Sequence, residues 1–243
     1  MLIPNISCSI SGAPKTGKTH LALTFPPPIA VFSFDLRGAE LLLPPYKTFF
    51  EGKEVVVKQY LPPITDSTKP DNSIVKLWSA IKADYRETVE SGKFATIIID
   101  PATMLWEIIR HSWQVEEGRN TVGVARNYGE PNARMTWMIT TPLVAGLNVI
   151  TTQYLKDVYV NDQPTGEKAL DGFKRTEGLA DVALWTQKAT RQASPDERRS
   201  QGTNLVNVVK TNITDCRFDR KLNGLELIDT TYNELMAMMG LSE

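Results

Sequence analysis

Gly12-Ala-Pro-Lys-Thr-Gly-Lys-Thr19 is the stretch that decides the fold, because it fits the pattern G-x-x-x-x-G-K-[ST] of a phosphate-binding loop. An apolar, strand-like run from Ile6 to Ile10 precedes it, and a helix-compatible run from His20 to Thr24 follows it. Strand, glycine-rich loop and helix form the context that the motif needs. A glycine-rich turn before a helix is the alternative interpretation, and this context counts against it.

The chemistry of such a loop follows from its backbone and from two side chains. Successive N–H groups wrap a polyphosphate, and the positive end of the following helix adds to their field. Glycines allow backbone torsions and close approaches that a Cβ would block. We expect Lys18 to reach the β- and γ-phosphates of ATP and the Thr19 hydroxyl to be a ligand of Mg²⁺. The residues predicted to bind the nucleotide are Gly12, Ala13, Pro14, Lys15, Thr16, Gly17, Lys18, Thr19 and His20.

Length, charge and cysteine usage narrow the class of protein. The 243 residues suffice for a single α/β domain over 1–243, with a core at about 5–228 and a short helix at about 232–239. A net charge of −1 gives no global basic field, so nucleic acid must bind to a local patch. Cys8 and Cys216 lack metal-ligand spacing and are expected to be reduced thiols. No apolar run could span a bilayer and no signal peptide is visible, which predicts a cytoplasmic protein without a membrane partner.

Apolar runs alternate with amphipathic runs along most of the chain. This pattern predicts a mainly parallel central sheet with helices on both faces, and the late strands predict an antiparallel C-terminal extension. Strands are predicted at 6–10, 29–34, 55–57, 94–99, 148–152, 158–160, 182–186, 205–213 and 225–228, and helices at 20–24, 74–89, from 101, at 132–145 and at 232–239.

Asp100 closes the apolar strand Thr96-Ile-Ile-Ile-Asp100. Phosphate-loop ATPases hold Mg²⁺ with an aspartate in this position, usually through water. A strand that ends in aspartate is common and is structural in many proteins. Together with the phosphate loop upstream, however, it predicts that Asp100 is a metal-binding and catalytic residue.

The order of the motifs GAPKTGKT, VFSFD, TIIID, NYG, NVITTQ, GLADVALW and NVVKTNI resembles the phage-encoded RecA-like P-loop ATPases of the single-strand-annealing, recombination-associated type. The resemblance extends from about Asn5 to Ile228. It implies a RecA-like ATPase that binds ATP and Mg²⁺ and acts on single-stranded DNA in phage recombination or replication. It also implies a homo-oligomer that holds the nucleotide at its subunit interfaces.

The resemblance implies roles for two further residues. Gln153, at the end of Asn148-Val-Ile-Thr-Thr-Gln153, matches a polar sensor of the γ-phosphate on a strand flanked by the phosphate-loop strand and the Asp100 strand. Lys210 matches a lysine that reaches the nucleotide of a neighbouring subunit and stabilises charge during phosphoryl transfer. The alternatives are a polar cap at the end of a strand for Gln153 and an exposed lysine on an antiparallel strand for Lys210.

The chain departs from the RecA-like pattern at the residue that activates water. RecA-like enzymes carry a glutamate two residues after the aspartate that ends the second strand, and here Asp35-Leu-Arg37 puts an arginine in that place. Glu40 substitutes for it if the loop is shifted, and Asp35 itself is another candidate. Hydrolysis can therefore be slow, or the protein can be chiefly a nucleotide-dependent binder.

Two polar segments are candidates for binding single-stranded DNA, because cations meet phosphates and aromatic rings stack on bases. The first contains Arg119, Arg126, Tyr128 and Arg134. The second runs from Tyr154 to about Arg175 and contains Lys156, Tyr159, Lys168, Phe173, Lys174 and Arg175. Acidic residues are interleaved in the second segment, so a solvated hairpin at 158–167 explains part of it equally well.

Two other functions stay open. A phosphate-loop kinase acting on a small molecule would use an arginine-rich lid, which Arg191, Arg198 and Arg199 could supply, although the β-rich C-terminal third argues against it. An assembly or loader protein would use ATP only to lock its shape, and Arg37 in the glutamate position favours this alternative. Turnover with and without single-stranded DNA separates these functions.

Overall fold

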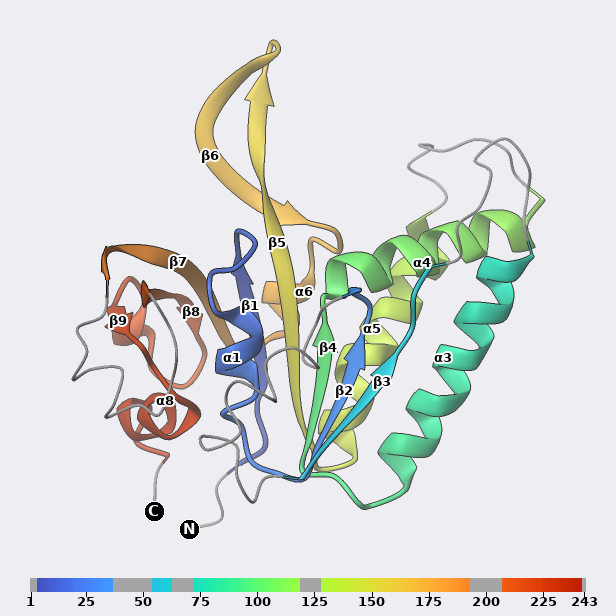
Figure 1. The fold of residues 1–243 in the computed structure, drawn as a ribbon, viewed down its shortest axis with the longest axis horizontal. Coiled ribbons are helices and arrows are strands. Elements are labelled where there is room, and N and C mark those ends of the chain that lie inside the picture. Colours follow the sequence, from blue (N-terminus) through green and yellow to red (C-terminus); the bar gives the residue numbers. More distant parts are fainter. Residues whose placement is uncertain (1–3, 37–53, 63–71, 119–127, 193–206, 242–243) are drawn as a thin grey trace.

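The computed structural model of the chain describes residues 4–36, 54–62, 72–118, 128–192 and 207–241. Strands in this part form a sheet in the order β3-β2-β4-β5-β1-β7-β8-β9, and β6 pairs with β5 beside it (Figure 1). The strands are β1 Ser7–Gly12, β2 Ile29–Ser33, β3 Val55–Gln59, β4 Thr96–Asp100, β5 Asn148–Val160, β6 Gln163–Asp171, β7 Val182–Gln192, β8 Asn207–Cys216 and β9 Glu226–Ile228.

Helices cover both faces of the sheet. On one face lie α1 (Lys18–Ala22) and α8 (Tyr232–Met238), and on the other lie α3 (Ser73–Glu90), α4 (Ala102–Glu116) and α5 (Gly129–Val144) (Figure 1). The short helix α6 spans Thr176–Leu179. Each face of the sheet has its own hydrophobic core, and β4 contributes side chains to both. Ile98 packs in the core beneath α1 and α8, whereas Ile97 and Ile99 pack in the core beneath α3, α4 and α5. The predicted mixed α/β fold with helices on both faces is therefore confirmed.

The pairing directions divide the sheet into two parts. Neighbouring strands from β3 across to β7 pair parallel, whereas β7 with β8 and β8 with β9 pair antiparallel. Both the mainly parallel sheet and its antiparallel C-terminal extension are as predicted. β5 lies between β1, which leads into the phosphate loop, and β4, which ends at Asp100. This is the strand order that the resemblance implied.

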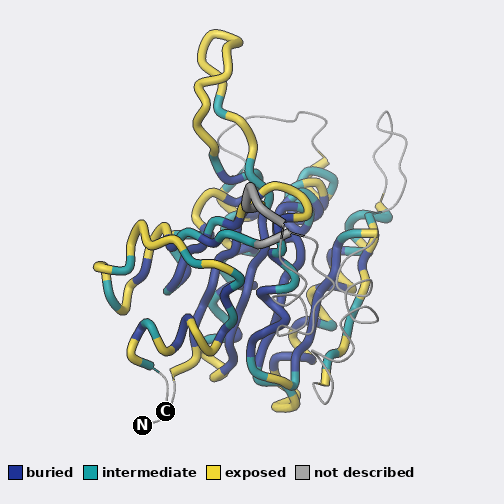
Figure 2. The backbone as a smooth tube through the Cα atoms, turned by 60° about the vertical axis from the view of Figure 1, so that its left-hand side comes forward, coloured by how far each residue is buried: buried dark blue, intermediate teal, exposed yellow. Residues whose placement is uncertain are grey.

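β5 is much longer than predicted. The two strands expected at 148–152 and 158–160 are one continuous strand, and it pairs antiparallel with β6, which overlaps the solvated hairpin considered for 158–167. Asn161 and Asp162 connect the two strands with positive φ angles of 51° and 59°, the pattern of a two-residue type I′ turn. The resulting β5–β6 hairpin projects beyond the sheet and is largely exposed (Figures 1 and 2). The prediction that the strand ends at Gln153 is therefore wrong.

Candidate functional site

The phosphate loop connects the end of β1 to the start of α1, and two glycines fix its path. A Cβ on Gly12 would lie 2.7 Å from Thr16 Oγ1 and still closer to Thr186 of β7. Gly17 has a φ of +83°, and a Cβ there would lie 2.9 Å from Val209 Cγ2 of β8. Only glycine fits these two positions without displacing a neighbour. β7 and β8 therefore brace the loop from the side opposite β5.

Lys18 is held inside the loop that carries it. Its ammonium donates to the carbonyl oxygens of Gly12, at 2.9 Å, and Ala13, at 2.7 Å. The residue is only 6% exposed. Burial, which disfavours the charged form, lowers the pKa of Lys18 to about 8, and the nearby Asp100 carboxylate partly opposes this shift. A cation sits in the loop at neutral pH, where the sequence places the terminal phosphates.

Asp100 is held by hydroxyl groups from two directions. Thr19 Oγ1 donates to Asp100 Oδ2 at 2.9 Å, and Thr152 of β5 donates to Oδ1. Burial raises the pKa of Asp100, while the two hydroxyl hydrogen bonds and Lys18 act in the opposite direction. A hydroxyl and a carboxylate are hard oxygen ligands of the kind that Mg²⁺ takes alongside phosphate and water. The donor set beside the loop therefore fits Mg²⁺ bound with a nucleotide.

Two further residues meet at this site. Asp35 follows the end of β2, and Tyr154 lies on β5 two residues beyond Thr152. The Tyr154 hydroxyl donates to Asp35 Oδ2 at 3.3 Å, and its ring centroid lies 4.9 Å from Lys18 Nζ. Burial, followed by the charges of Asp35 and Asp100, raises the pKa of Tyr154 to about 12. The sequence pattern pointed to Asp35, whereas Tyr154 lies beyond the predicted end of the strand at Gln153 and was not singled out as a site residue.

Gln153 does not face the phosphate loop. Successive side chains of a strand point to opposite faces, so Gln153 lies on the face opposite Thr152 and Tyr154. It is completely buried, and its Nε2 donates to the carbonyl oxygen of Phe173 at 3.4 Å. The direct contact with the γ-phosphate that was predicted for Gln153 is therefore not supported by this geometry. Alternation along β5 would have pointed to its two neighbours instead.

The predicted DNA-binding side chains differ in their surroundings. Phe173 is 1% exposed and packs on Trp106, with 5.3 Å between ring centroids. The prediction that a DNA base stacks on Phe173 is therefore wrong. Lys156 Nζ lies 3.3 Å from Asp171 Oδ1 across the hairpin. Tyr159 is 61% exposed. Lys174 and Arg175 are exposed just beyond the hairpin. Arg126 lies outside the described residues, and so do Arg37 and Glu40, the two positions considered for the water-activating residue.

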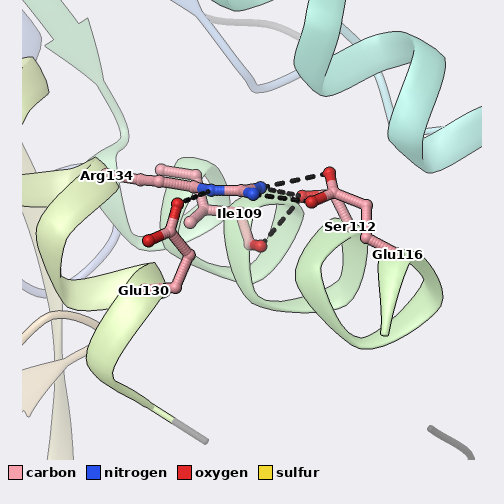
Figure 3. Close-up of polar contacts among 5 residues, drawn as sticks. All are labelled: Ile109, Ser112, Glu116, Glu130 and Arg134. Carbon is pink, nitrogen blue, oxygen red and sulfur yellow. Dashed lines mark hydrogen bonds and ion pairs between the residues drawn. The ribbon is translucent and has the colours of Figure 1, made fainter. Parts of the chain in front are cut away.

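Arg134 belongs to a structural cluster rather than to a solvent-facing loop. Its guanidinium contacts Glu116 of α4 at 2.6 Å and Glu130 of α5 at 3.0 Å (Figure 3). It also lies over the rings of Trp78 and Trp113, at 5.6 and 5.3 Å from their centroids. The expectation that Arg134 serves single-stranded DNA is therefore not supported, because its hydrogen-bonding edge is taken up by the two glutamates.

Lys210 lies on β8 and has a partner within the chain. Its ammonium is 2.7 Å from Glu226 Oε1 of β9. Both side chains are partly exposed, so the pair faces solvent. The role across a subunit interface stays a prediction, and it requires Lys210 to leave Glu226.

A phosphate loop that carries a buried lysine, beside an aspartate on a parallel strand two places away, defines the chain as a P-loop NTPase. Residues 4–180 match the family described as AAA domain. Because this match covers most of the chain, the protein belongs to that family of P-loop ATPases, whose members generally use ATP and Mg²⁺. No curated protein matches the sequence. In the described segments, no helix has both the length and the apolar character needed to cross a membrane.

Proposed function

We propose that the protein hydrolyses ATP with Mg²⁺ and acts on single-stranded DNA in phage recombination or replication, as a homo-oligomer. The observation that carries the nucleotide part is the convergence of Lys18, Thr19 and Asp100 at the end of β1. The RecA-like motif order and membership of an ATPase family support the same conclusion.

Each residue of the site has a defined task in this proposal. Lys18 exchanges the carbonyl oxygens of its own loop for the β- and γ-phosphate oxygens and neutralises their charge. Thr19 and Asp100, already joined by a hydrogen bond, would hold the metal ion. Mg²⁺ held there would neutralise part of the charge of the phosphates. Thr152 keeps the carboxylate of Asp100 aimed at this place.

The DNA part of the proposal rests on the β5–β6 hairpin and the residues that follow it. Lys156 and Lys168 have carboxylate partners, at Asp171 and Asp157 respectively. Lys174 and Arg175 are exposed, and no ion pair of theirs occurs among the described residues. Exposed Tyr159 offers a ring on which a base can stack. Tyr159, Lys174 and Arg175 are therefore the side chains best suited to a single strand.

The nucleotide part is tested by binding of Mg·ATP to two variants. Lys18→Ala should weaken binding roughly tenfold to a hundredfold, since hydrogen bonds to charged groups contribute about 1.5–3 kcal/mol. Asp100→Asn should keep part of the affinity but lose its dependence on Mg²⁺. The exposed Lys93→Ala serves as the control and should bind normally. Unchanged affinity in a folded Lys18→Ala protein would refute the nucleotide site.

The DNA part is tested by ATP turnover and by binding with and without single-stranded DNA. Turnover stimulated by DNA supports the proposal, turnover that requires a small phosphoryl acceptor indicates a kinase, and binding without turnover indicates a nucleotide-locked assembly protein. Removing the charges of Lys174 and Arg175 together should flatten the log–log salt dependence of DNA binding by roughly 0.7 for each lost contact. An unaltered slope would show that the strand binds elsewhere.

A further inference from the structure

Tyr154 occupies the point where the nucleotide site and the β5–β6 hairpin meet. Its backbone N–H donates to Thr103 Oγ1 at 3.0 Å, and that hydroxyl donates to the carbonyl oxygen of Asp171 at 2.7 Å. Tyr154 and Asp171 are also register partners at the base of the hairpin. The Tyr154 backbone is therefore fixed by α4 and β6 at once, which limits where its ring can lie.

We propose that Tyr154 is the positioning residue that holds Asp35 in the orientation needed to bind the attacking water during ATP hydrolysis. This inference rests on the proposed function. Its basis is one side chain with two contacts: the ring lies against the ammonium of Lys18, and the hydroxyl donates to Asp35. Asp35 is thereby tied to the residue that contacts the terminal phosphates.

The position of Asp35 in the sheet supports this role. β2, which precedes it, is the direct neighbour of β4, and Ser33 is the register partner of Asp100. Asp35 lies two residues beyond Ser33, past the end of β2, and its carboxylate is located by the hydrogen bond that it accepts from the Tyr154 hydroxyl. The charge of Asp35 contributes to raising the pKa of both Asp100 and Tyr154, which agrees with its position close to these two residues. A second carboxylate thus lies close to Asp100.

The pairing offers a substitute for the glutamate whose place Arg37 takes in the sequence. Aspartate has one methylene fewer than glutamate. Asp35 therefore has a shorter reach, and its side chain has fewer rotamers. A hydroxyl donor fixed on β5 removes part of the remaining freedom, and orientation of the reacting groups is a large part of catalysis. Tyr154 acts through Asp35 and makes no contact of its own with the attacking water.

A double-mutant cycle in ATP turnover tests this inference. Tyr154→Phe keeps the ring against Lys18 and removes only the hydroxyl. We expect it to lower kcat about threefold to tenfold while leaving the KM for ATP and the unfolding temperature unchanged. Asp35→Asn should lower kcat by roughly a hundredfold or more, as the loss of a proton-accepting group does. The double variant should match Asp35→Asn alone within about twofold, because the Tyr154 hydroxyl is proposed to act only through Asp35.

Tyr60→Phe is the matched control, since it also removes a tyrosine hydroxyl that donates to a carboxylate, that of Asp84, and Tyr60 packs in the core on the side of α3 and α4. This variant should leave kcat unchanged. Losses that multiply in the double variant would overturn the inference, as would an unchanged kcat in Tyr154→Phe. A fall in kcat that is accompanied by a lower unfolding temperature in Tyr154→Phe would also overturn it, because it would indicate a purely structural role. If the wild-type protein shows no turnover at all, the proposed function fails, and this inference fails with it.

Discussion

Lys18 combines a buried position with a required positive charge. Its pKa is lowered to about 8, below the ordinary value of 10.5, so the free protein loses this charge as the pH rises through about 8. The phosphates of ATP stay ionised at such a pH and favour the protonated lysine. Binding above pH 8 must therefore take up a proton, and the cost of that proton appears as lost affinity.

We predict that the affinity for ATP falls as the pH rises above about 8, by up to tenfold per pH unit. Below that pH the lysine is already charged, so the affinity should level off. Titration calorimetry from about pH 7 to pH 9 measures this profile. Lys18→Ala, which has no charge to lose, is the control and should give a flat profile, and an equally flat profile in the wild-type protein would contradict the prediction.

Arg134 is a stability residue in our interpretation. Arg134→Ala should lower the free energy of unfolding by about 2 kcal/mol, because it leaves Glu116 and Glu130 unpaired and uncovers two tryptophan rings. Arg110→Ala removes an arginine whose ion pair, with Glu107, lies within α4 and should cost less than about 1 kcal/mol. Denaturant unfolding measures both values. If Arg134→Ala instead weakens DNA binding in a fully stable protein, the cluster has been misinterpreted.

At the scale of secondary-structure elements, the outer part of the β5–β6 hairpin, residues 158–167, can be removed while β5 keeps its pairing with β1 and β4. Asp157 and Lys168 are register partners, so an Asn-Gly turn joining them replaces 158–167 by a tight connection. We expect basal ATP turnover to stay within about twofold and the affinity for single-stranded DNA to fall roughly tenfold, since stacking on an aromatic ring contributes about 1–3 kcal/mol per base. A filter-binding or anisotropy assay gives the affinity. Undiminished DNA binding would exclude the hairpin tip as a contact.

The hairpin was considered from the sequence only at 158–167, and the full length of its two strands was not predicted. The core strands were recognisable because each is a short, continuous apolar run, as in Thr96–Asp100. β6 has no apolar face, and it contains Pro164 and Gly166, which usually argue against a strand. Here they are tolerated because β6 pairs with β5 alone and lies on the exposed hairpin. Its partner was cut short for the same reason, at the point where burial ends.

The candidate site likewise contains residues that the sequence predicts and residues that it does not. The loop from Gly12 to Thr19 is contiguous, so its spacing alone predicts it, and Asp100 follows from the apolar strand that it closes. The contact between Asp35 and Tyr154 joins residues 119 positions apart and depends on which strands are neighbours. Burial was equally invisible for Phe173, because an aromatic residue beside basic residues can pack inward as well as outward. Three-dimensional packing decided each of these cases.

At the scale of the whole molecule, the prediction concerns complementation between subunits. If Lys210 acts on a neighbour's nucleotide, Lys210→Ala should keep ATP affinity and lose turnover, because a cation supplied in trans stabilises chiefly the transition state. Mixing it with excess Lys18→Ala protein should restore some activity, since each variant supplies what the other lacks. Phosphate release is measured against the mixing ratio at constant total protein.

Glu226→Gln provides a second arm of this experiment, because it removes the charge that holds Lys210 within its own chain. Turnover in this variant should be at least as fast as in the wild-type protein. If mixtures shown to co-assemble give no more than the sum of the separate variants, Lys210 is a surface lysine paired with Glu226.

The bracing of the phosphate loop by β7 and β8 has a consequence for how the protein can be divided. The family match ends at residue 180, whereas Thr186 and Val209, which confine Gly12 and Gly17, come later. A fragment cut at that boundary would lose the parallel partner on one side of β1 and expose a row of unpaired N–H and C=O groups. Such a fragment should aggregate through this open edge. The sheet that holds the phosphate loop therefore extends beyond the segment that matches the family.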